Sequence, residues 1–341
     1  MEAFLIDEWI GEDDAIPIED DASISAARQK AREVALAQQM SAVDADRLAT
    51  IASELGQNQL RYARHGQIAV RAILRGPHRG VEICAADQGE GLADPTRALE
   101  GRARRPESLG AGLAAVREHA DEVDIDVRLR EGTCIRARLF HGEAPRRREV
   151  GVYGRPYRDE PMSGDHACIF RGDDKLVVGV CDGLGHGPPA RSAASRAMRI
   201  FVEHQTGTPQ SIIEACHRGL GPTRGAVMAV VSVAEGSARA PGLELASVGN
   251  ITVQLVQPHS ERRFGASSFV LGSPQRGWRS HVEASTMDAS ETLIVFTDGI
   301  ESRVSLDEDL ALLREHPIII AHQLVERFAR DNDDVLVLVA K

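Results

Sequence analysis

The stretch Asp182-Gly183-Leu184-Gly185-His186-Gly187 directly follows the apolar run Leu176-Val177-Val178-Gly179-Val180-Cys181. Such a run predicts a buried β-strand, so the aspartate that ends it is expected at the edge of a sheet. The same pattern of an aspartate beside an apolar strand recurs along the second half of the chain. The aspartates with this position are Asp165, Asp182, Asp298 and Asp333, the last with Asp334 beside it.

Carboxylates that gather at one place repel one another unless a cation neutralises them. Ligands that are all oxygen favour Mg²⁺ or Mn²⁺ over Zn²⁺. Two such cations could activate a water and neutralise a phosphoryl group, which is the chemistry that hydrolysis of a phosphoserine needs. Each aspartate taken alone would equally suit a turn or a helix cap. Asp333 is preferred over Asp334 as the fourth ligand, because Asp334 then takes a supporting polar position.

His186 lies between two glycines. Two interpretations stay open for it: a phosphate contact or general acid, and a residue of an ordinary turn.

The first half contains a second distinctive stretch, Asp87-Gln88-Gly89-Glu90-Gly91. Asp87 follows a predicted buried strand and could accept a hydrogen bond from the amino group of an adenine. Gly89 and Gly91 would let the backbone pass close to the base, where a side chain would block it. This pattern also suits an ordinary turn, so its weight depends on its surroundings.

Those surroundings add the other parts of a nucleotide site. Glu54 and Asn58 are one helical turn apart and therefore face the same way. Asn58 could hold a magnesium ion through its carbonyl oxygen, and Glu54 could accept a proton from a substrate hydroxyl. Gly110 and Gly112 open a predicted helix, whose free backbone N–H groups could hold phosphates.

Periodicity predicts the elements of each half. The first half is expected to contain helices at 23–40, capped by Ser23 or Ser25, 44–64 and 109–121, and strands at 67–75, 80–86, 123–130 and 133–140. The second half is expected to contain strands at 165–171, 175–181, 226–234, 243–248, 251–257, 292–297 and 335–340, and helices at 189–205, 209–219 and 317–330. The first order predicts a two-layer α/β sandwich and the second predicts stacked sheets flanked by helices.

A linker is expected at 141–149, where glycine, proline and three consecutive arginines interrupt the periodic pattern. The expected organisation is an N-terminal extension at 1–15, a first domain at 16–140, the linker, and a second domain at 150–341. The acidic beginning of the chain, which includes the apolar Trp9 and Ile10, has two open interpretations. It is a first strand with a loose terminus, or a docking segment.

Composition narrows the classes of function. A length of 341 residues suits two domains, and 43% apolar residues are enough for two cores. A net charge of −11 disfavours nucleic acid and anionic membranes as partners. The five cysteines form no C-x-x-C pair, which disfavours a zinc ribbon or a redox motif. We expect no signal peptide and no membrane span, and hence a cytoplasmic protein.

The first half resembles the GHKL ATPase superfamily, and within it the anti-sigma and stressosome-type serine kinases of the RsbT group. The resemblance implies a Bergerat-type sandwich in which Asn58 binds magnesium, Glu54 is the base, Asp87 binds adenine and Thr133 belongs to the ATP site. The implied substrate is a serine or threonine of a STAS-domain antagonist. The matching stretches are Ile16–Ile18, Ala26–Arg32, Ser53–Asn58, Asp87–Gly91, Leu109–Leu113 and Glu131–Thr133.

The second half resembles the metal-dependent protein phosphatase (PPM) superfamily in its SpoIIE/RsbX branch. The resemblance implies a β-sandwich in which Asp182 bridges the metals near the Gly183 carbonyl, while Asp165, Asp298 and Asp333 complete the ligand shell. The matching stretches are Ser163–Asp165, Asp182–Gly187, Gly225–Met228, Ser247–Asn250, Thr297–Gly299 and Asp333–Asp334. The expected fold class is therefore α+β, a Bergerat (GHKL) α/β sandwich followed by a PPM-type α-β-β-α sandwich.

Together the two halves predict a bifunctional regulator that uses ATP and Mg²⁺ or Mn²⁺. Its expected partners are STAS-domain antagonists or stressosome-type proteins, and also a sigma-factor regulator. One departure motivates a second hypothesis: residues 102–108 carry three arginines and a proline where the family has a glycine-rich lid. In that hypothesis only the phosphatase is an enzyme, and the first domain senses nucleotide or binds a partner. A third hypothesis is a protein that only sequesters its partner, which would need no metal-binding carboxylates.

Overall fold

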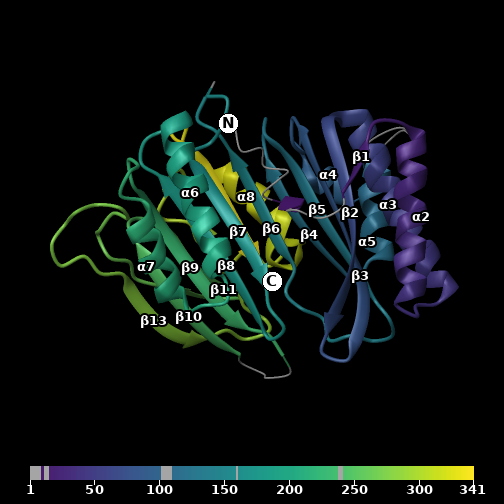
Figure 1. The fold of residues 1–341 in the computed structure, drawn as a ribbon. Coiled ribbons are helices and arrows are strands. Elements are labelled where there is room, and N and C mark those ends of the chain that lie inside the picture. Colours follow the sequence, from purple (N-terminus) through teal and green to yellow (C-terminus); the bar gives the residue numbers. More distant parts are fainter. Residues whose placement is uncertain (1–8, 11–14, 101–109, 159, 237–240) are drawn as a thin grey trace. The chain divides into compact units, whose positions relative to one another are not determined.

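The computed structural model describes residues 9–10, 15–100, 110–158, 160–236 and 241–341. The chain divides into two compact units, Met1–Val150 and Gly151–Lys341 (Figure 1). No helix in these described ranges has both the length and the apolar character needed to cross a membrane.

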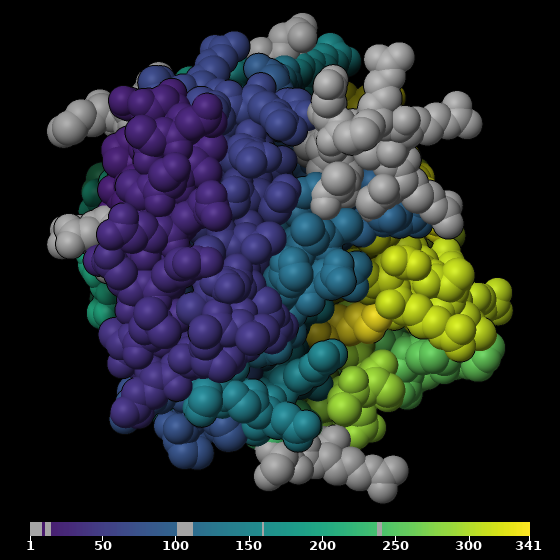
Figure 2. Space-filling model, turned by 90° about the vertical axis from the view of Figure 1, so that its right-hand side faces the viewer, coloured from purple at the N-terminus to yellow at the C-terminus, as the bar shows by residue number. Residues whose placement is uncertain are grey.

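The N-terminal unit is a two-layer sandwich. Its strands are all antiparallel to their neighbours and follow the order β1-β2-β3-β5-β4. Helices α2, α3 and α5 pack against this sheet, and Figure 2 shows α2 in purple beside α3 on the outer surface of this layer. The bounds are β1 Ile16–Ile18, α2 Asp21–Ala37, α3 Ala42–Tyr62, β2 Ala63–Arg75, β3 His78–Gly89, α4 Pro95–Leu99, α5 Gly110–His119, β4 Glu122–Arg128 and β5 Gly132–Phe140.

The first two helices begin at side-chain caps. The Asp20 carboxylate accepts a hydrogen bond from the Ser23 backbone N–H at 2.8 Å, and the Ser23 hydroxyl oxygen accepts one from the Asp20 N–H at 3.1 Å. This reciprocal pair satisfies N–H groups that the first turn leaves free. The prediction that Ser23 or Ser25 is the cap was therefore wrong, because Ser23 instead completes a cap provided by Asp20. Ser41 caps α3 in a similar way.

The segment expected as a linker is hydrogen bonded to β4 of the N-terminal unit. The backbone N–H groups of Arg147 and Val150 donate to the carboxylates of Glu122 and Asp124, at 2.8 and 2.7 Å. In the other direction, the Val123 N–H donates to the Glu149 carboxylate at 2.7 Å. These bonds fasten residues 147–150 to β4.

Trp9 and Ile10 are also part of this unit, where they pack in a buried cluster with Ala69, Cys84, Ala86 and Cys134. The indole N–H of Trp9 donates to Asp126 at 3.1 Å, and Arg136 donates to the Trp9 carbonyl at 2.8 Å. The remaining residues of the expected extension, 1–8 and 11–14, lie outside the described ranges.

The C-terminal unit contains two stacked sheets, which confirms the predicted α-β-β-α layers (Figure 1). In one sheet the strands of this unit follow the order β6-β15-β14-β11-β12 and pack against α8. The other sheet has the order β13-β10-β9-β8-β7 and packs against α6 and α7. The strands are β6 Val150–Arg155, β7 Asp165–Arg171, β8 Lys175–Gly183, β9 Ala226–Ala234, β10 Gly242–Val248, β11 Thr252–Gln257, β12 Ser260–Arg263, β13 His281–Thr286, β14 Thr292–Phe296 and β15 Val335–Ala340. The helices are α6 Pro188–His204, α7 Pro209–Gly219 and α8 Pro317–Phe328, with a 3₁₀ turn at Leu312–Arg314.

The core beneath α6 and α7 brings together large side chains from both helices and from β8 and β9, among them Val177, Met198, Phe201, Ile212 and Met228. This packing fixes the start of α6 against the end of β8, where the glycine-rich stretch 182–187 lies.

Candidate functional sites

The first candidate site is an acidic corner at the ends of β7 and β8. Asp165 and Asp182 are register partners on these two neighbouring strands. Asp165 is buried, and its carboxylate accepts a hydrogen bond from the Thr297 hydroxyl at 2.7 Å. Burial raises the pKa of Asp165 well above its usual range, and the nearby Asp182 charge raises it further. The structure thus brings two of the predicted aspartates side by side.

The other acidic residues lie within electrostatic reach of Asp182. Burial, and after it the charges of Asp298, Asp333 and Asp334, raise the pKa of Asp182 to about 8. Charge effects of this kind act between groups that are near one another and partly shielded from water. Asp182 therefore lies near Asp298, Asp333 and Asp334, and beside its register partner Asp165.

Asp333 and Asp334 differ in how their oxygens are engaged. Asp334 is 3% exposed, and its two carboxylate oxygens accept the backbone N–H groups of Tyr157 and Gly164 at 2.6 and 2.8 Å. Asp333 is half-buried and has one described bond, from the Asp334 N–H at 3.0 Å. Burial and the Asp298 charge raise the pKa of Asp333. Asp334 thus ties two loops together, while Asp333 faces the acidic corner.

Glycines allow the backbone to close around this corner. A β-carbon on Gly183 would collide with the Ala190 carbonyl at the start of α6, and one on Gly299 would collide with the Asp334 carbonyl. No side chain fits in such contacts without a shift of backbone. The positions of Asp182 and Asp298 therefore depend on the glycine that follows each of them.

His186 is exposed, and its Nδ1 lies 2.8 Å from the Glu160 carboxylate. Its ring lies 5.3 Å from the ring of Tyr157. The flanking Gly185 and Gly187 have φ angles of 89° and 70°, a region that favours glycine. The stretch is thus a glycine turn, and the carboxylate orients the imidazole within it. Both interpretations of His186 remain open.

The residues of the corner fit a hard divalent cation. Among the described residues no three Asp, Glu, His or Cys side chains are close enough to enclose a metal ion by themselves. Mg²⁺ does not need such a cage, because it usually takes one or two carboxylates and keeps several waters. Burial raises the pKa of Asp165, Asp182 and Asp333, neighbouring carboxylates raise it further, and a bound cation would offset both effects.

Two supporting residues were not predicted. Thr297 donates to Asp165 and, through the same oxygen, accepts the Leu336 N–H at 3.0 Å. Asn250 donates its side-chain N–H to the Asp298 carboxylate at 2.6 Å. The available signal was adjacency, because Thr297 directly precedes Asp298 and Asn250 ends the stretch Ser247–Asn250.

The second candidate site lies in the N-terminal unit, where α3 meets the first turn of α5. A β-carbon on Gly112 would lie 2.8 Å from the Glu54 carboxylate and 3.3 Å from both the nitrogen and the oxygen of the Asn58 amide. Three residues predicted to act together are therefore in contact. Gly110 is the first residue of α5, so the two predicted glycines belong to the same opening turn.

Asp87 lies near the end of β3 and is a register partner of Thr133 on β5. Its carboxylate accepts the Gly89 N–H at 2.8 Å and the Thr133 backbone N–H. Burial nevertheless raises the pKa of Asp87 to about 6, because the two hydrogen bonds offset only part of the desolvation. Gly91 has a φ of 78°, and a β-carbon there would lie 3.1 Å from the Arg128 carbonyl oxygen.

Gln59 connects the two parts of this site, and it too was not predicted. It is 4% exposed, and its side-chain N–H donates to the carbonyls of Ala86 and Gln67 at 2.9 and 3.1 Å. Since Gln59 follows Asn58 and Ala86 precedes Asp87, this bond ties the helix of one site residue to the strand of the other. Its position four residues after the buried Leu55 was the available signal. The predicted lid, 102–108, lies outside the described residues.

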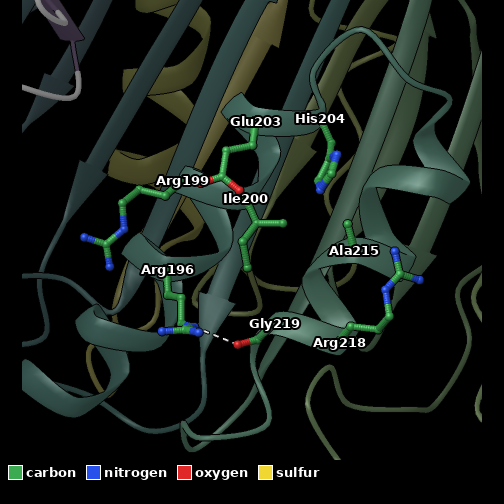
Figure 3. A pocket seen from close by; sticks show the side chains of 8 residues that line it. All are labelled: Arg196, Arg199, Ile200, Glu203, His204, Ala215, Arg218 and Gly219. Carbon is green, nitrogen blue, oxygen red and sulfur yellow. Dashed lines mark hydrogen bonds between the residues drawn. The ribbon is translucent and has the colours of Figure 1, made fainter.

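A separate basic pocket of about 510 Å³ lies between α6 and α7. Figure 3 shows Arg196 reaching the Gly219 carbonyl, to which it donates at 2.6 Å, while Arg199 and Arg218 point away from each other. Its lining residues are Arg196, Arg199, Ile200, Glu203, His204, Ala215, Arg218 and Gly219. None of the site residues predicted from the sequence lines this pocket.

Comparison with known proteins assigns each half to a family. Residues 18–139 match the model of the histidine kinase-like ATPase domain, and residues 172–341 match that of stage II sporulation protein E (SpoIIE). The serine/threonine-protein kinase RsbT of Bacillus subtilis (strain 168) is 38% identical over 114 residues, which are 33% of this chain and 86% of RsbT.

Two solved structures are also similar. One is a chain from the solved structure described as "The bacterial stressosome: a modular system that has been adapted to control secondary messenger signaling". It is 30% identical to this chain with a TM-score of 0.52, and the match covers 57% of this chain and all of the other. The structure of RsbX in complex with magnesium is 22% identical with a TM-score of 0.50, over 58% of this chain and 96% of RsbX, and this likeness concerns the fold alone. The chain thus belongs to the histidine kinase-like ATPases as a relative of the kinase RsbT, and joins that ATP-binding domain to a SpoIIE-family domain with a metal-dependent serine/threonine phosphatase fold.

Proposed function

We propose that this protein is a bifunctional partner-switching regulator. Its N-terminal domain transfers phosphate from ATP to a serine or threonine, and its C-terminal domain removes phosphate from phosphoserine or phosphothreonine. Both act on STAS-domain antagonist or scaffold proteins of a bacterial stress or sigma-factor pathway. The relationship to RsbT and the likeness to a stressosome chain support this choice of partners.

The observation that carries the phosphatase is the pairing of Asp165 with Asp182 at the ends of β7 and β8, with the carboxylates of Asp298, Asp333 and Asp334 near Asp182. In the proposal the carboxylates of Asp182, Asp165, Asp298 and Asp333, together with the Gly183 carbonyl, would hold the metal ions. When bound, these ions neutralise phosphoryl oxygens and activate the attacking water. Thr297 and Asn250 hold the carboxylates of Asp165 and Asp298 in fixed orientations. Oxygen ligands suit both Mg²⁺ and Mn²⁺.

The contact of Gly112 with Glu54 and Asn58 supports the kinase. Asn58 would hold the magnesium ion of the nucleotide, and Glu54 would take the proton of the attacking hydroxyl. Asp87 would accept the adenine amino group, with Gly89, Gly91 and Thr133 around it. The N–H groups at Gly110 and Gly112 would face the phosphates. We propose a cytoplasmic location, where ATP and such partners occur together.

The test is a pair of assays on one STAS-domain protein, supplied both unphosphorylated and phosphorylated. We expect the wild type to transfer phosphate from labelled ATP and, in a separate reaction with Mn²⁺ or Mg²⁺, to release it. Glu54→Gln should lose transfer and keep release, while Asp182→Asn should show the opposite pattern.

Tight ATP binding without phosphate transfer to any STAS partner would favour the alternative hypothesis, in which the first domain senses nucleotide. The arginine-rich segment 102–108 is the reason for considering that hypothesis. Absence of release from phosphorylated partners with either metal would overturn the phosphatase.

A further inference from the structure

The pairing of β8 with β9 continues beyond the acidic corner. Within the strands Asp182 is the partner of Val227, and Gly183 is the partner of Ala226. The next step is made by the Leu184 N–H, which donates to the Gly225 carbonyl at 3.1 Å. Following the same register, Gly185 lies opposite Arg224, and a β-carbon on Gly185 would be 3.2 Å from a guanidinium nitrogen of Arg224. This arginine therefore faces the glycine turn that follows Asp182.

The backbone that carries Arg224 is held on both sides. The Thr223 hydroxyl donates to the Leu220 carbonyl at 2.7 Å, and its oxygen accepts the Gly225 N–H at 3.0 Å. Gly225 has a φ of 88°, and Leu271 donates its N–H to the carbonyl of the next residue, Ala226, at 2.8 Å. The guanidinium thus projects from a fixed turn.

Arg224 is not neutralised by the acidic corner. Its side chain is exposed, and no described carboxylate lies within ion-pair distance of it. Arg191, by contrast, is buried and donates to the Ser163 carbonyl at 3.5 Å. Arg224 therefore remains available to an anion that arrives from solvent.

We infer that Arg224 binds the phosphate group of the phosphoserine or phosphothreonine substrate. This inference rests on the proposed phosphatase activity, to which it adds Arg224 as the positively charged residue that binds the substrate. A phosphate monoester carries close to two negative charges at neutral pH, so a corner made of carboxylates needs positive charge to admit it. The guanidinium fork matches phosphate oxygens with two parallel hydrogen bonds, which a point charge does not provide.

The experiment compares the wild type, Arg224→Ala, Arg224→Lys and Arg199→Ala, an exposed arginine of the basic pocket between α6 and α7. Two quantities are measured on the full chain with Mn²⁺: steady-state release from a phosphoserine peptide, and binding of inorganic phosphate by calorimetry. We expect Arg224→Ala to raise KM and to weaken phosphate binding by about 10- to 100-fold, because hydrogen bonds to charged groups contribute that much. The value of kcat and the Mn²⁺ concentration for half activation should change much less.

Arg224→Lys should recover part of the phosphate binding, and Arg199→Ala should match the wild type. Wild-type KM and wild-type phosphate binding in Arg224→Ala would overturn the inference. Phosphate binding that depends on Arg224 in a wild type that releases no phosphate would sustain the inference and refute the proposed phosphatase. Circular dichroism of each variant confirms that it is folded.

Discussion

The two candidate sites hold their polar groups in opposite ways. In the C-terminal unit, burial raises the pKa of Asp165 and Asp182 and neighbouring carboxylates raise it further, so the corner is electrostatically unfavourable without a cation. In the N-terminal unit, burial alone raises the pKa of Asp87, and Glu54 and Asn58 are positioned by contact with a glycine. The comparison indicates that one site is specified by charge and the other by shape, and each prediction below tests that contrast.

The largest effect is expected from Asp182→Asn. Metal ions contribute several kcal/mol to the transition state, and about 1.4 kcal/mol corresponds to a factor of ten, so phosphate release should fall about 1,000-fold. The variant should also melt at a higher temperature than the metal-free wild type, because one of the opposing carboxylates is gone. Calorimetry with and without Mn²⁺ measures the melting temperature, and Asp331→Asn, at an exposed position, is the control. A lower melting temperature than the metal-free wild type would contradict a site specified by charge.

The next effect is expected from Glu54→Gln in the site specified by shape. A general base contributes about 100-fold or more, so phosphoryl transfer should fall by at least that factor while the size and shape of the side chain are kept. ATP affinity should stay within about twofold, since the amide still fills the space against Gly112. Single-turnover transfer and equilibrium ATP binding separate the two effects, and Glu33→Gln on the neighbouring helix is the control. Equal losses of binding and transfer would show that the charge of Glu54 positions the nucleotide.

A pH dependence is expected at Asp87. Its pKa in the folded protein is about 6, above the ordinary value of 3.8, so ionisation lowers folding stability as the pH rises from about 4 through 6. Binding of the adenine amino group needs the ionised acceptor and should have the opposite trend. We expect adenosine affinity to fall about tenfold per pH unit below pH 6, a slope that Asp87→Asn should abolish. Adenosine avoids titration of the phosphates, and a flat profile in the wild type would exclude Asp87 as the acceptor.

The smallest effect is expected from Thr297→Val, which keeps the shape and removes the hydroxyl. Loss of the hydrogen bond to the Asp165 carboxylate should cost about 1 to 3 kcal/mol of unfolding free energy. The concentration of Mn²⁺ for half activation should rise about tenfold, as expected when a group that orients a metal ligand is removed. Denaturant unfolding and a metal titration measure the two quantities, and Thr252→Val, on the edge of the same unit, is the control. An unchanged metal titration would mean that Asp165 needs no such support.

The strand-end aspartates could be predicted from the sequence because an apolar run followed by Asp is a local pattern. It did not contain the register that makes Asp165 the partner of Asp182, nor the 2.7 Å bond between Thr297 and Asp165, which joins residues 132 positions apart. Strand β13 escaped prediction because its alternating side chains are only half-buried or exposed, which leaves no apolar face to recognise. Strand β6 contains two glycines among few residues and shows no periodicity.

In the N-terminal half, helical spacing correctly placed Glu54 and Asn58 on one face. The same spacing carried the signal for Gln59, since it continues the buried stripe of α3 that includes Leu48, Ile51 and Leu55. The role of a buried polar residue cannot be predicted until its hydrogen-bond partners are known. The partners of Gln59 are carbonyls of β2 and β3. Long-range hydrogen bonds to backbone are therefore the part of this site that a linear pattern does not encode.

The glycines that face backbone carbonyls have a consequence for how this protein can change during evolution. In the proposed phosphatase, replacing Asp182 by its amide keeps the size of the side chain and removes a charged metal ligand. Gly183 and Gly299 have no such freedom, because any side chain there meets main chain. We therefore expect relatives that have lost the proposed activity to keep both glycines even where the aspartates have been replaced.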